Sequence, residues 1–298
     1  MPSLKDLKIR INTVKSTQKI TSAMKMVASA KLKRAQEKAE SGRPYATKMS
    51  SIVSTLASKV NSESGPKLLF GNKENNRVLL VAISADRGLC GGFNNNISKE
   101  IRKRVNDLEK DNKEVKLILV GRKVGTVLKR EMGDRIIGSF TGIQGDNLSF
   151  SKISPITLQI ISLFEDDKID CVEMYYNRFR SVISQVVTKK QLIPADVNTE
   201  TPDNDEESTY EYEPEEEMIL DHLLPRNLST QIYSALLDSS AGELAARMTA
   251  MDNATRNAGE LIDRLTLEYN RTRQAFITKE LIEIISVSYT HLTLPTKA

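Results

Sequence analysis

Residues 244–276 read LAARMTAMDNATRNAGELIDRLTLEYNRTRQAF, and this stretch decides the fold. One stripe of apolar, small and polar side chains recurs along it at steps that alternate between four and three residues. The stripe consists of Leu244, Met248, Met251, Thr255, Ala258, Ile262, Leu265, Tyr269, Thr272 and Phe276. Such a repeat keeps one narrow seam of a helix turned toward a partner helix. We therefore expect a long helix that belongs to a coiled coil.

The beginning of the chain carries a second stripe with similar spacing. It consists of Leu4, Leu7, Ile11, Val14, Gln18, Thr21, Met24, Ala28, Leu32 and Ala35. Small and polar side chains in such a seam indicate two closely and unevenly packed helices. Since the two stripes lie at opposite ends of the chain, the simplest arrangement is an antiparallel coiled coil within one molecule, with a domain inserted at one end. Two ordinary amphipathic helices on a globular domain are the alternative.

The middle of the chain alternates between strand-like and helix-like segments. Strands are expected over residues 77–84, 115–120, 135–140, 171–179 and 182–192, and helices over 97–108, 125–131 and 154–164. The first strand is a continuous apolar run, as in a buried parallel strand. Ser154 and Pro155 fit the cap and the first position of the last helix. This alternation predicts an inserted Rossmann-like α/β domain, so the fold class is mixed α+β.

These patterns divide the chain into segments. We expect a long helix over residues 1–60, an inserted α/β domain over 61–197, an acidic loop over 198–217, a second long helix over 218–286 and a tail over 287–298. Ser3 is a candidate N-cap for the first helix, which Gly42 and Pro44 disturb locally. Pro225 is expected to interrupt the second helix near its start. The loop is acidic, contains Pro and is poor in apolar residues, which favours an exposed segment.

The composition excludes several classes of protein. With 39% hydrophobic and 28% charged residues it is typical of a soluble folded protein, and no apolar run approaches the roughly 18 residues that a membrane span needs. The N-terminal residues MPSLKDLKIR lack the apolar stretch of a secretory signal. Cys90 and Cys171 lie far apart without flanking histidines, which excludes a disulfide framework or a zinc site, and we expect both to be buried thiols at strand ends. His222 and His291 are the only histidines, so acid–base catalysis by histidine has little to work with.

Charge is distributed unevenly along the chain. Between Lys5 and Lys38 there are ten basic residues and only two acidic ones, whereas residues 203–217 hold nine acids and no base. A basic helix can bind nucleic acid. Here the basic residues are spread around the helix without interleaved aromatic residues that would stack on bases. A solvated helix inside an acidic or polar partner is therefore favoured over a nucleic-acid binder.

The segment SADRGLCGGFN, residues 84–94, follows a strand and precedes a helix, where a phosphate-binding loop would lie. Its glycines, Gly88, Gly91 and Gly92, do not have the spacing of a dinucleotide fingerprint, and no P-loop motif occurs in the chain. We interpret Asp86, Arg87 and the three glycines as a structural turn in which glycine permits positive φ and close packing. A protein contact at this turn is compatible with that interpretation.

Residues suited to catalysis are absent from the sequence. Neither G-x-S-x-G nor H-E-x-x-H occurs, and neither cysteine has a clear histidine partner. The neighbouring acids Asp166 and Asp167 indicate a solvated cluster at a helix end, since nothing apolar nearby would raise a pKa. The pattern favours a mechanical role over a chemical one, without a cofactor.

Three stretches together carry a family resemblance that covers about residues 1–286. They are INTVKSTQKITSAMKMVASAKLKRA over residues 11–35, the SADRGLCGGFN turn, and RMTAMDNATRNAGELIDRLTLEYNRTRQAFITKELIE over residues 247–283. The chain resembles the gamma subunits of F-type ATP synthases, the central rotor shaft. The resemblance implies that the paired helices turn inside a hexamer of alpha and beta subunits and couple proton flow to ATP synthesis or hydrolysis. It also implies that the α/β domain forms a foot on the epsilon subunit and on the membrane ring of c subunits.

The resemblance also implies roles for individual residues. Met24, in the A-M-x-M-V stretch, and the Arg273-Gln274 pair would contact a beta subunit. Thr278 and Glu280 fall on the I-T-x-E-x-x-E signature and would belong to the same contact. Arg247 would steady the coiled coil across from the neighbourhood of Met24. Catalytic sites would lie on the beta subunits, so this chain would be a non-catalytic part of the enzyme complex.

The end of the chain departs from the family. In place of a Gly-Ala-rich tip, residues 287–298 read VSYTHLTLPTKA, which breaks the heptad and is interpreted as a non-native extension. The expected location is the cytoplasmic face of a bacterial inner membrane, with the matrix side of the mitochondrial inner membrane as the alternative. Two other functions stay open from the residues alone: a nucleotide-binding regulatory protein with coiled-coil arms, and a basic coiled-coil binder of nucleic acid.

Overall fold

A computed structural model describes residues 3–60, 65–72, 75–145, 148–195 and 216–292. The chain forms two compact units, one of Met1–Val27 with Ala250–Ala298 and the other of Ala28–Thr249. Two long helices, α1 (Leu4–Ala57) and α6 (Glu216–Leu292), contribute to both units. Among the described residues, no helix has a stretch that is both long and apolar enough to span a bilayer.

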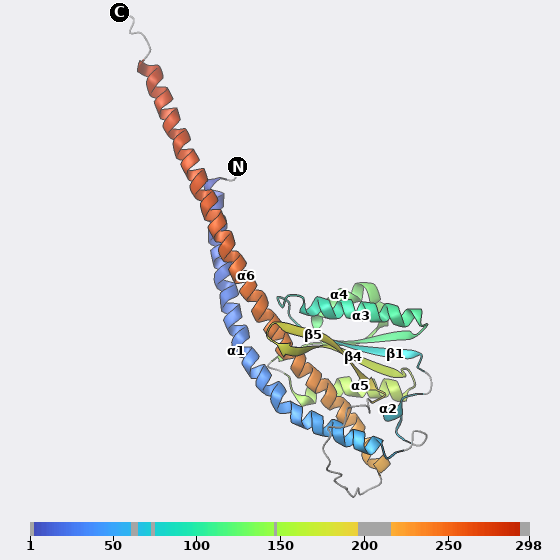
Figure 1. The fold of residues 1–298 in the computed structure, drawn as a ribbon. Helices are drawn as coiled ribbons and strands as arrows, with labels where there is room; N and C mark the ends of the chain where they lie inside the picture. Colours follow the sequence, from blue (N-terminus) through green and yellow to red (C-terminus); the bar gives the residue numbers. More distant parts are fainter. Residues whose placement is uncertain (1–2, 61–64, 73–74, 146–147, 196–215, 293–298) are drawn as a thin grey trace, which may run out of the picture. The chain divides into compact units, whose positions relative to one another are not determined.

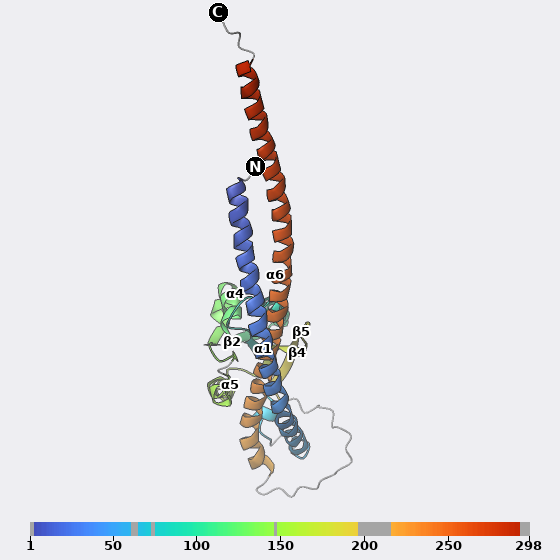
Figure 2. The ribbon, with the colours of Figure 1, turned by 90° about the vertical axis from the view of Figure 1, so that its left-hand side faces the viewer.

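The first unit is an antiparallel pair of helices (Figure 2). Leu7 and Ile11 of α1 are buried with Leu265 of α6, and further along α1 the hydroxyl of Thr21 lies 2.8 Å from that of Thr255. Positions later in α1 therefore meet positions earlier in α6, as an antiparallel coiled coil requires. At the start of α1, Ser3 Oγ accepts a hydrogen bond from the backbone N–H of Asp6 at 3.2 Å, which confirms the predicted cap.

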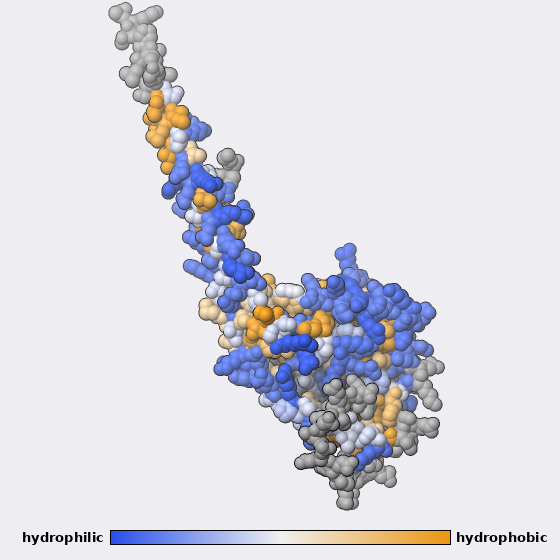
Figure 3. Space-filling view, viewed as in Figure 1, coloured by the Kyte–Doolittle hydropathy of each residue, from blue (hydrophilic) through white to orange (hydrophobic). Residues whose placement is uncertain are grey.

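The predicted seam of α6 is correct through Thr272 and wrong at Phe276. The side chain of Tyr269 packs against the cluster around Leu7, whereas Phe276, two turns further on, is 51% exposed. Because α1 begins at Leu4, it offers no residue that far along α6. Other apolar side chains of this last part of α6 are also exposed, namely Ile277, Leu281, Ile282, Ile284 and Ile285 (Figure 3).

The second unit contains a five-stranded sheet in the order β3-β2-β1-β4-β5. Its strands are β1 (Arg77–Ile83), β2 (Glu114–Val120), β3 (Ile136–Phe140), β4 (Cys171–Ser181) and β5 (Ser184–Ile193). The first four are parallel to their neighbours, and β5 is antiparallel to β4. The reason is the connection, since only two residues separate β4 from β5 and so short a link permits only a hairpin.

Helices cover both faces of this sheet (Figure 1). On one face lie α3 (Phe93–Lys110) and α4 (Arg122–Met132), and on the other lie α5 (Ser154–Glu165) and part of α6. A short helix, α2 (Lys67–Phe70), precedes the sheet. The alternation of side chains along β4 divides its residues between the two cores: Cys171 and Tyr175 face α3, whereas Val172, Met174 and Tyr176 face α5 and α6. The α/β domain predicted from the sequence is therefore present.

One proline prediction needs correction. Helix α1 runs past Pro44 as expected, but Pro225 also lies inside a continuous helix and does not interrupt α6. The buried side chains of Leu224 and Leu228 flank Pro225 on the packed face of α6. Their burial outweighs the roughly 3 kcal/mol that a proline costs in a helix interior.

Other boundaries also differ from those predicted. The cap of α5 is Ile153 instead of Ser154, because a 3₁₀ turn over Phe150–Lys152 leads directly into the helix. Helix α6 continues past residue 286 to Leu292. Cys171 begins a strand as expected, but Cys90 lies in a turn, and both are buried. The predicted acidic loop lies outside the described residues, except for its last two positions, which begin α6.

Candidate functional site

The carboxyl end of the sheet is where an open α/β fold normally binds a ligand, in the crevice beside the strand at which the order reverses. In this chain α6 occupies that position. A Cβ atom added at Gly242 would lie 3.3 Å from a ring carbon of Phe93 and 3.5 Å from the carbonyl oxygen of Asn177. Asn177, in the second half of β4, also donates a hydrogen bond from Nδ2 to the carbonyl oxygen of Phe93 at 3.1 Å. Helix α6, strand β4 and the turn therefore pack against one another at this edge of the sheet, and this packing closes the crevice.

The turn at residues 84–94 is held by its own side chains. Asn94 Oδ1 accepts a hydrogen bond from the backbone N–H of Ala85 at 2.9 Å, and Asn94 Nδ2 contacts Cys90 Sγ at 3.2 Å. Gly91 has a φ of 57°, as predicted for a glycine in this turn, whereas Gly92 does not have positive φ. Leu89 has a φ of 63° although it is not a glycine. This conformation is strained for a bulky residue, and it persists only where the surrounding structure holds it in place.

Asp86 joins this turn to the loops that follow the next two strands. Its Oδ1 accepts a hydrogen bond from the backbone N–H of Arg122 at 3.1 Å, and its Oδ2 accepts one from Gly142 at 3.0 Å. Gly121, just before Arg122, approaches so closely that a Cβ atom there would lie 2.0 Å from the carbonyl oxygen of Ser84. One carboxylate therefore fixes three loops along the carboxyl edge of the sheet.

Arg247 connects the same turn to α6. Its guanidinium donates a hydrogen bond to the carbonyl oxygen of Gly88 at 3.2 Å and forms an ion pair with Glu243 one helical turn earlier. Burial raises the pKa of the Glu243 carboxyl, and the Arg247 guanidinium offsets part of that rise. Burial likewise raises the pKa of the Cys90 thiol, with a further rise from the nearby Glu243. The predicted steadying of the coiled coil by Arg247 stays a prediction, since these contacts join α6 to the turn.

The remaining predicted contact residues lie in the first unit. Met24 is half-buried on α1. On α6, the side chains of Arg273, Gln274, Thr278 and Glu280 are all exposed. The exposed group lies on the part of α6 beyond its seam with α1, so it is open to a partner. Arg87, at the tip of the turn, is exposed as well.

Sequence reasoning missed Gly242, Glu243 and Asn177. The spacing of Glu243 and Arg247, four residues apart on one helix, is a signal that predicts their ion pair. No sequence pattern indicates the close contact of Gly242 with Phe93 and Asn177, because this contact joins segments that are distant along the chain. In the part of the chain that the structure covers, no group of three or more His, Cys, Asp or Glu side chains is placed to hold a metal ion.

Solved structures similar to this chain come from rotary synthases. The chain is similar to a chain of the central stalk and c-ring of the Tetrahymena thermophila mitochondrial ATP synthase, with a TM-score of 0.60, 30% identity and coverage of 79% of this chain and 99% of that one. A chain of the Euglena gracilis mitochondrial ATP synthase has the same fold, with a TM-score of 0.70 at 18% identity, over 99% of this chain and 97% of that one.

Sequence relatives agree over nearly the whole length. The ATP synthase gamma chain of Acidiphilium cryptum (strain JF-5) is 53% identical over 291 residues, and that of Jannaschia sp. (strain CCS1) is 52% identical over 291 residues. Each match covers 96% of this chain and 98% of the relative. A family model described as ATP synthase matches residues 3–288. Because the match is this long and this similar, the chain belongs to the family of ATP synthase gamma chains.

Proposed function

We propose that this chain is the central-stalk subunit of an F-type ATP synthase and turns inside a hexamer of alpha and beta subunits. The observation that carries the proposal is the antiparallel pairing of α1 with α6, in which Thr21 meets Thr255 across 234 positions of sequence. Pairing of remote ends produces a double-helical rod, and nothing in the described site resembles a catalytic centre. The relatives named gamma chains and the central-stalk structure from Tetrahymena support the same role.

A pair of helices has no threefold symmetry, so it contacts the three catalytic subunits of a hexamer differently. Such differential contact shifts each nucleotide site toward a different affinity, which is what population shift requires. The coupling is reciprocal, so ATP hydrolysis drives the rod in the opposite sense. In this proposal the catalytic sites lie on the beta subunits, and this chain contributes no catalytic group.

The second unit would serve as the foot. Torque applied to the α/β domain reaches α6 through the packing of Gly242 against its neighbours and through the hydrogen bond from Arg247 to Gly88. The foot would rest on the epsilon subunit and on the ring of c subunits, at the cytoplasmic face of a bacterial inner membrane. The gamma chains of Acidiphilium cryptum and Jannaschia support a bacterial setting.

The exposed residues of the rod would contact the beta subunits. Arg273 and Gln274 lie one turn before Thr278, and Glu280 follows, so all four occupy about two turns of α6. Met24 would meet a beta subunit from α1. These contacts distinguish the proposal from a free coiled coil, because substitutions there change coupling while the helix pair stays folded.

Reconstitution tests the proposal. Alpha and beta subunits from Acidiphilium cryptum, whose gamma chain is 53% identical, are mixed with this chain, and ATP-driven rotation of a bead on the foot is recorded. We expect rotation in three steps per turn, and ATP hydrolysis that depends on the added chain. A hexamer that hydrolyses ATP at the same rate without this chain, and shows no rotation with it, contradicts the proposal.

The packing of α6 against Phe93 and Asn177 disfavours the alternative of a nucleotide-binding regulatory protein. The backbone of α6 at Gly242 packs against Phe93 and Asn177, in the crevice in which the dinucleotide of a Rossmann-like domain would lie. Equilibrium dialysis of the isolated chain against ATP and NAD distinguishes the two functions, since the rotor proposal predicts no saturable binding of either at that crevice.

A further inference from the structure

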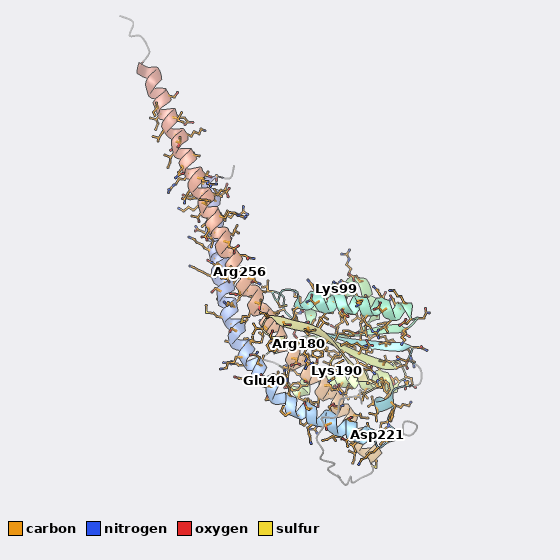
Figure 4. The ribbon with its side chains drawn as sticks, viewed as in Figure 1. Glu40, Lys99, Arg180, Lys190, Asp221 and Arg256 are labelled. Carbon is orange, nitrogen blue, oxygen red and sulfur yellow. The ribbon has the colours of Figure 1, made fainter. Side chains whose placement is uncertain are left out.

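A cavity in the α/β unit has no part in the proposed function. It has a volume of about 410 Å³ and lies where α1, α6 and the end of β4 meet. Arg43 of α1 and Arg178 and Arg180 of β4 line it together with Glu40 of α1 and Asp238 of α6. Figure 4 labels Glu40 and Arg180, which approach the cavity from two different elements.

The alternation of β4 explains why two arginines reach this cavity. Met174 and Tyr176 point from β4 into the core shared with α6, and Arg178 continues the same face of the strand. Arg180 lies where the register between β4 and β5 shifts, and it also lines the cavity. The core ends before these two positions, because both side chains are exposed. Two guanidinium groups from the last part of β4 therefore lie at the mouth of the cavity.

The charges in the cavity are only partly compensated. Arg43 lies 3.7 Å from Asp238, whose side chain is only 14% exposed. Burial raises the pKa of Asp238, and the charges of Arg43 and Arg178 offset part of that rise. Among the described residues, the side chains of Arg178 and Arg180 form no hydrogen bond or ion pair. A guanidinium without an acceptor keeps its full capacity to bind an oxyanion.

We propose that this cavity is a binding site for a phosphoryl anion such as orthophosphate or pyrophosphate, held by Arg178 and Arg180 with Arg43. The planar guanidinium fork matches the geometry of phosphate oxygens. The cavity has the volume of a small-ligand site and exceeds what a single phosphate fills, which favours pyrophosphate or a larger phosphoryl compound. Ala39, Ala241 and Phe179 line it with apolar side chains, and Gln36 adds one neutral polar group, so the charged groups dominate the choice of ligand.

Substitution of Asp238 is expected to change anion binding in the opposite direction to substitution of the arginines. Its carboxylate repels an anion in the cavity, so Asp238→Asn is expected to tighten binding, whereas Arg178→Gln and Arg180→Gln weaken it. A site for a basic ligand would respond in the opposite way to both changes. The matched control is Lys99→Gln with Lys103→Gln on α3, two exposed lysines that line no part of the cavity.

Calorimetric titration of the full chain with orthophosphate and with pyrophosphate, in a buffer low in chloride, measures the binding. We expect saturable binding with pyrophosphate bound more tightly, about tenfold or more weakened in the Arg178→Gln, Arg180→Gln double variant and strengthened in Asp238→Asn. The Lys99→Gln, Lys103→Gln control is expected to bind as the parent does. Circular dichroism of every variant verifies that it is folded.

The proposal is overturned by the absence of saturable binding of either anion, by equal binding by the parent and the double arginine variant, or by an equal loss of binding in the lysine control. Binding of a hexaglutamate peptide without binding of pyrophosphate also overturns it, because the cavity would then recognise a carboxylate-bearing protein segment. If the double variant is unfolded, the sign of the change in Asp238→Asn decides.

Discussion

The guanidinium of Arg247 donates a hydrogen bond to the carbonyl oxygen of Gly88 although 159 positions of sequence separate the two residues. The bond joins α6 to the turn that follows β1, and the ion pair with Glu243 fixes the direction of the guanidinium. Glu243 is only 7% exposed, so its carboxylate depends mainly on Arg247, with a smaller contribution from the charge of Arg87. The pair is therefore both a link between helix and domain and a point of vulnerability.

Arg247→Ala is expected to destabilise the chain by about 3 kcal/mol, because it leaves the buried Glu243 carboxylate without its partner. Burial already raises the folded-state pKa of Glu243, and loss of Arg247 raises it further. A group whose folded pKa exceeds its unfolded value stabilises below the unfolded pKa and loses that contribution as pH rises through the folded pKa. The variant is thus most destabilised at neutral pH and recovers toward pH 4, measured by denaturant unfolding across pH. The double change Arg247→Met, Glu243→Gln is the control, and equal loss in both proteins contradicts the prediction.

The close packing around Gly242 predicts that a larger side chain at this position lowers the stability of the chain. Gly242→Val places methyl groups against Phe93 and Asn177, where a Cβ atom alone already lies at 3.3 Å and 3.5 Å, so we expect a loss of about 2 kcal/mol in unfolding free energy. Gly125→Ala in α4 is the matched control, since its nearest neighbour would lie 3.7 Å from the added Cβ. That change is expected to be neutral or to stabilise by up to about 1 kcal/mol, because alanine favours a helix. A Gly242→Val protein as stable as the parent would show that the crevice is open.

Two leucines that are neighbours on α6 test the coiled coil. Leu265 is 3% exposed and packs in the seam with Leu7 and Ile11, whereas Leu267 is 54% exposed. Leu265→Ala is expected to lower the unfolding free energy of the helix pair by about 2 to 4 kcal/mol, and Leu267→Ala by less than about 0.5 kcal/mol. Thermal unfolding followed by circular dichroism compares the two variants. Similar losses in both would mean that α1 and α6 do not pair in this register.

Acid is expected to weaken the edge of the α/β domain through Asp170. Burial would raise the pKa of Asp170, but hydrogen bonds from Arg77, Asn72 and the backbone of Arg77 and Asn76 lower it to about 2. Since the folded pKa is below the unfolded value, the carboxylate contributes about 2 kcal/mol above pH 4, and this contribution is lost as pH falls from about 4 to about 2. Asp170→Asn is expected to be less stable at pH 7 and to show a flatter pH dependence over that range. Asp166→Asn, at an exposed carboxylate, should leave the curve unchanged.

Met24→Lys is expected to impair coupling in the assembled synthase. A lysine at this half-buried position of α1 places a charge where the proposed contact with a beta subunit is apolar. Proton pumping by membrane vesicles, measured at matched rates of ATP hydrolysis, reports the effect. Met26→Lys, at a side chain that is 65% exposed, is the control and should pump as the parent does. Equal pumping by the Met24→Lys variant and the parent would remove Met24 from the contact.

Periodicity along the sequence determined the long helices and the positions of the strands along the chain. Steps of three and four residues predicted the seam from Leu7 to Ala35 and from Leu244 to Thr272, because a helical repeat depends only on residues within a few turns. The apolar run of β1 and the two-residue link before β5 likewise carry their own signal. The local pattern failed at Pro225, where burial of the neighbouring Leu224 and Leu228 outweighs the cost of proline.

Tertiary structure alone decided which distant residues meet. The sequence contains Gly242, Asn177 and Phe93, but nothing in their local patterns indicates that α6 lies in the crevice where a ligand would bind. The same holds for the three arginines around Asp238, which come from two elements that only folding brings together. The physical reason is that periodicity indicates only which face of a helix or strand is buried. The partner of that face depends on how the whole chain minimises its exposed apolar surface and pairs its buried charges.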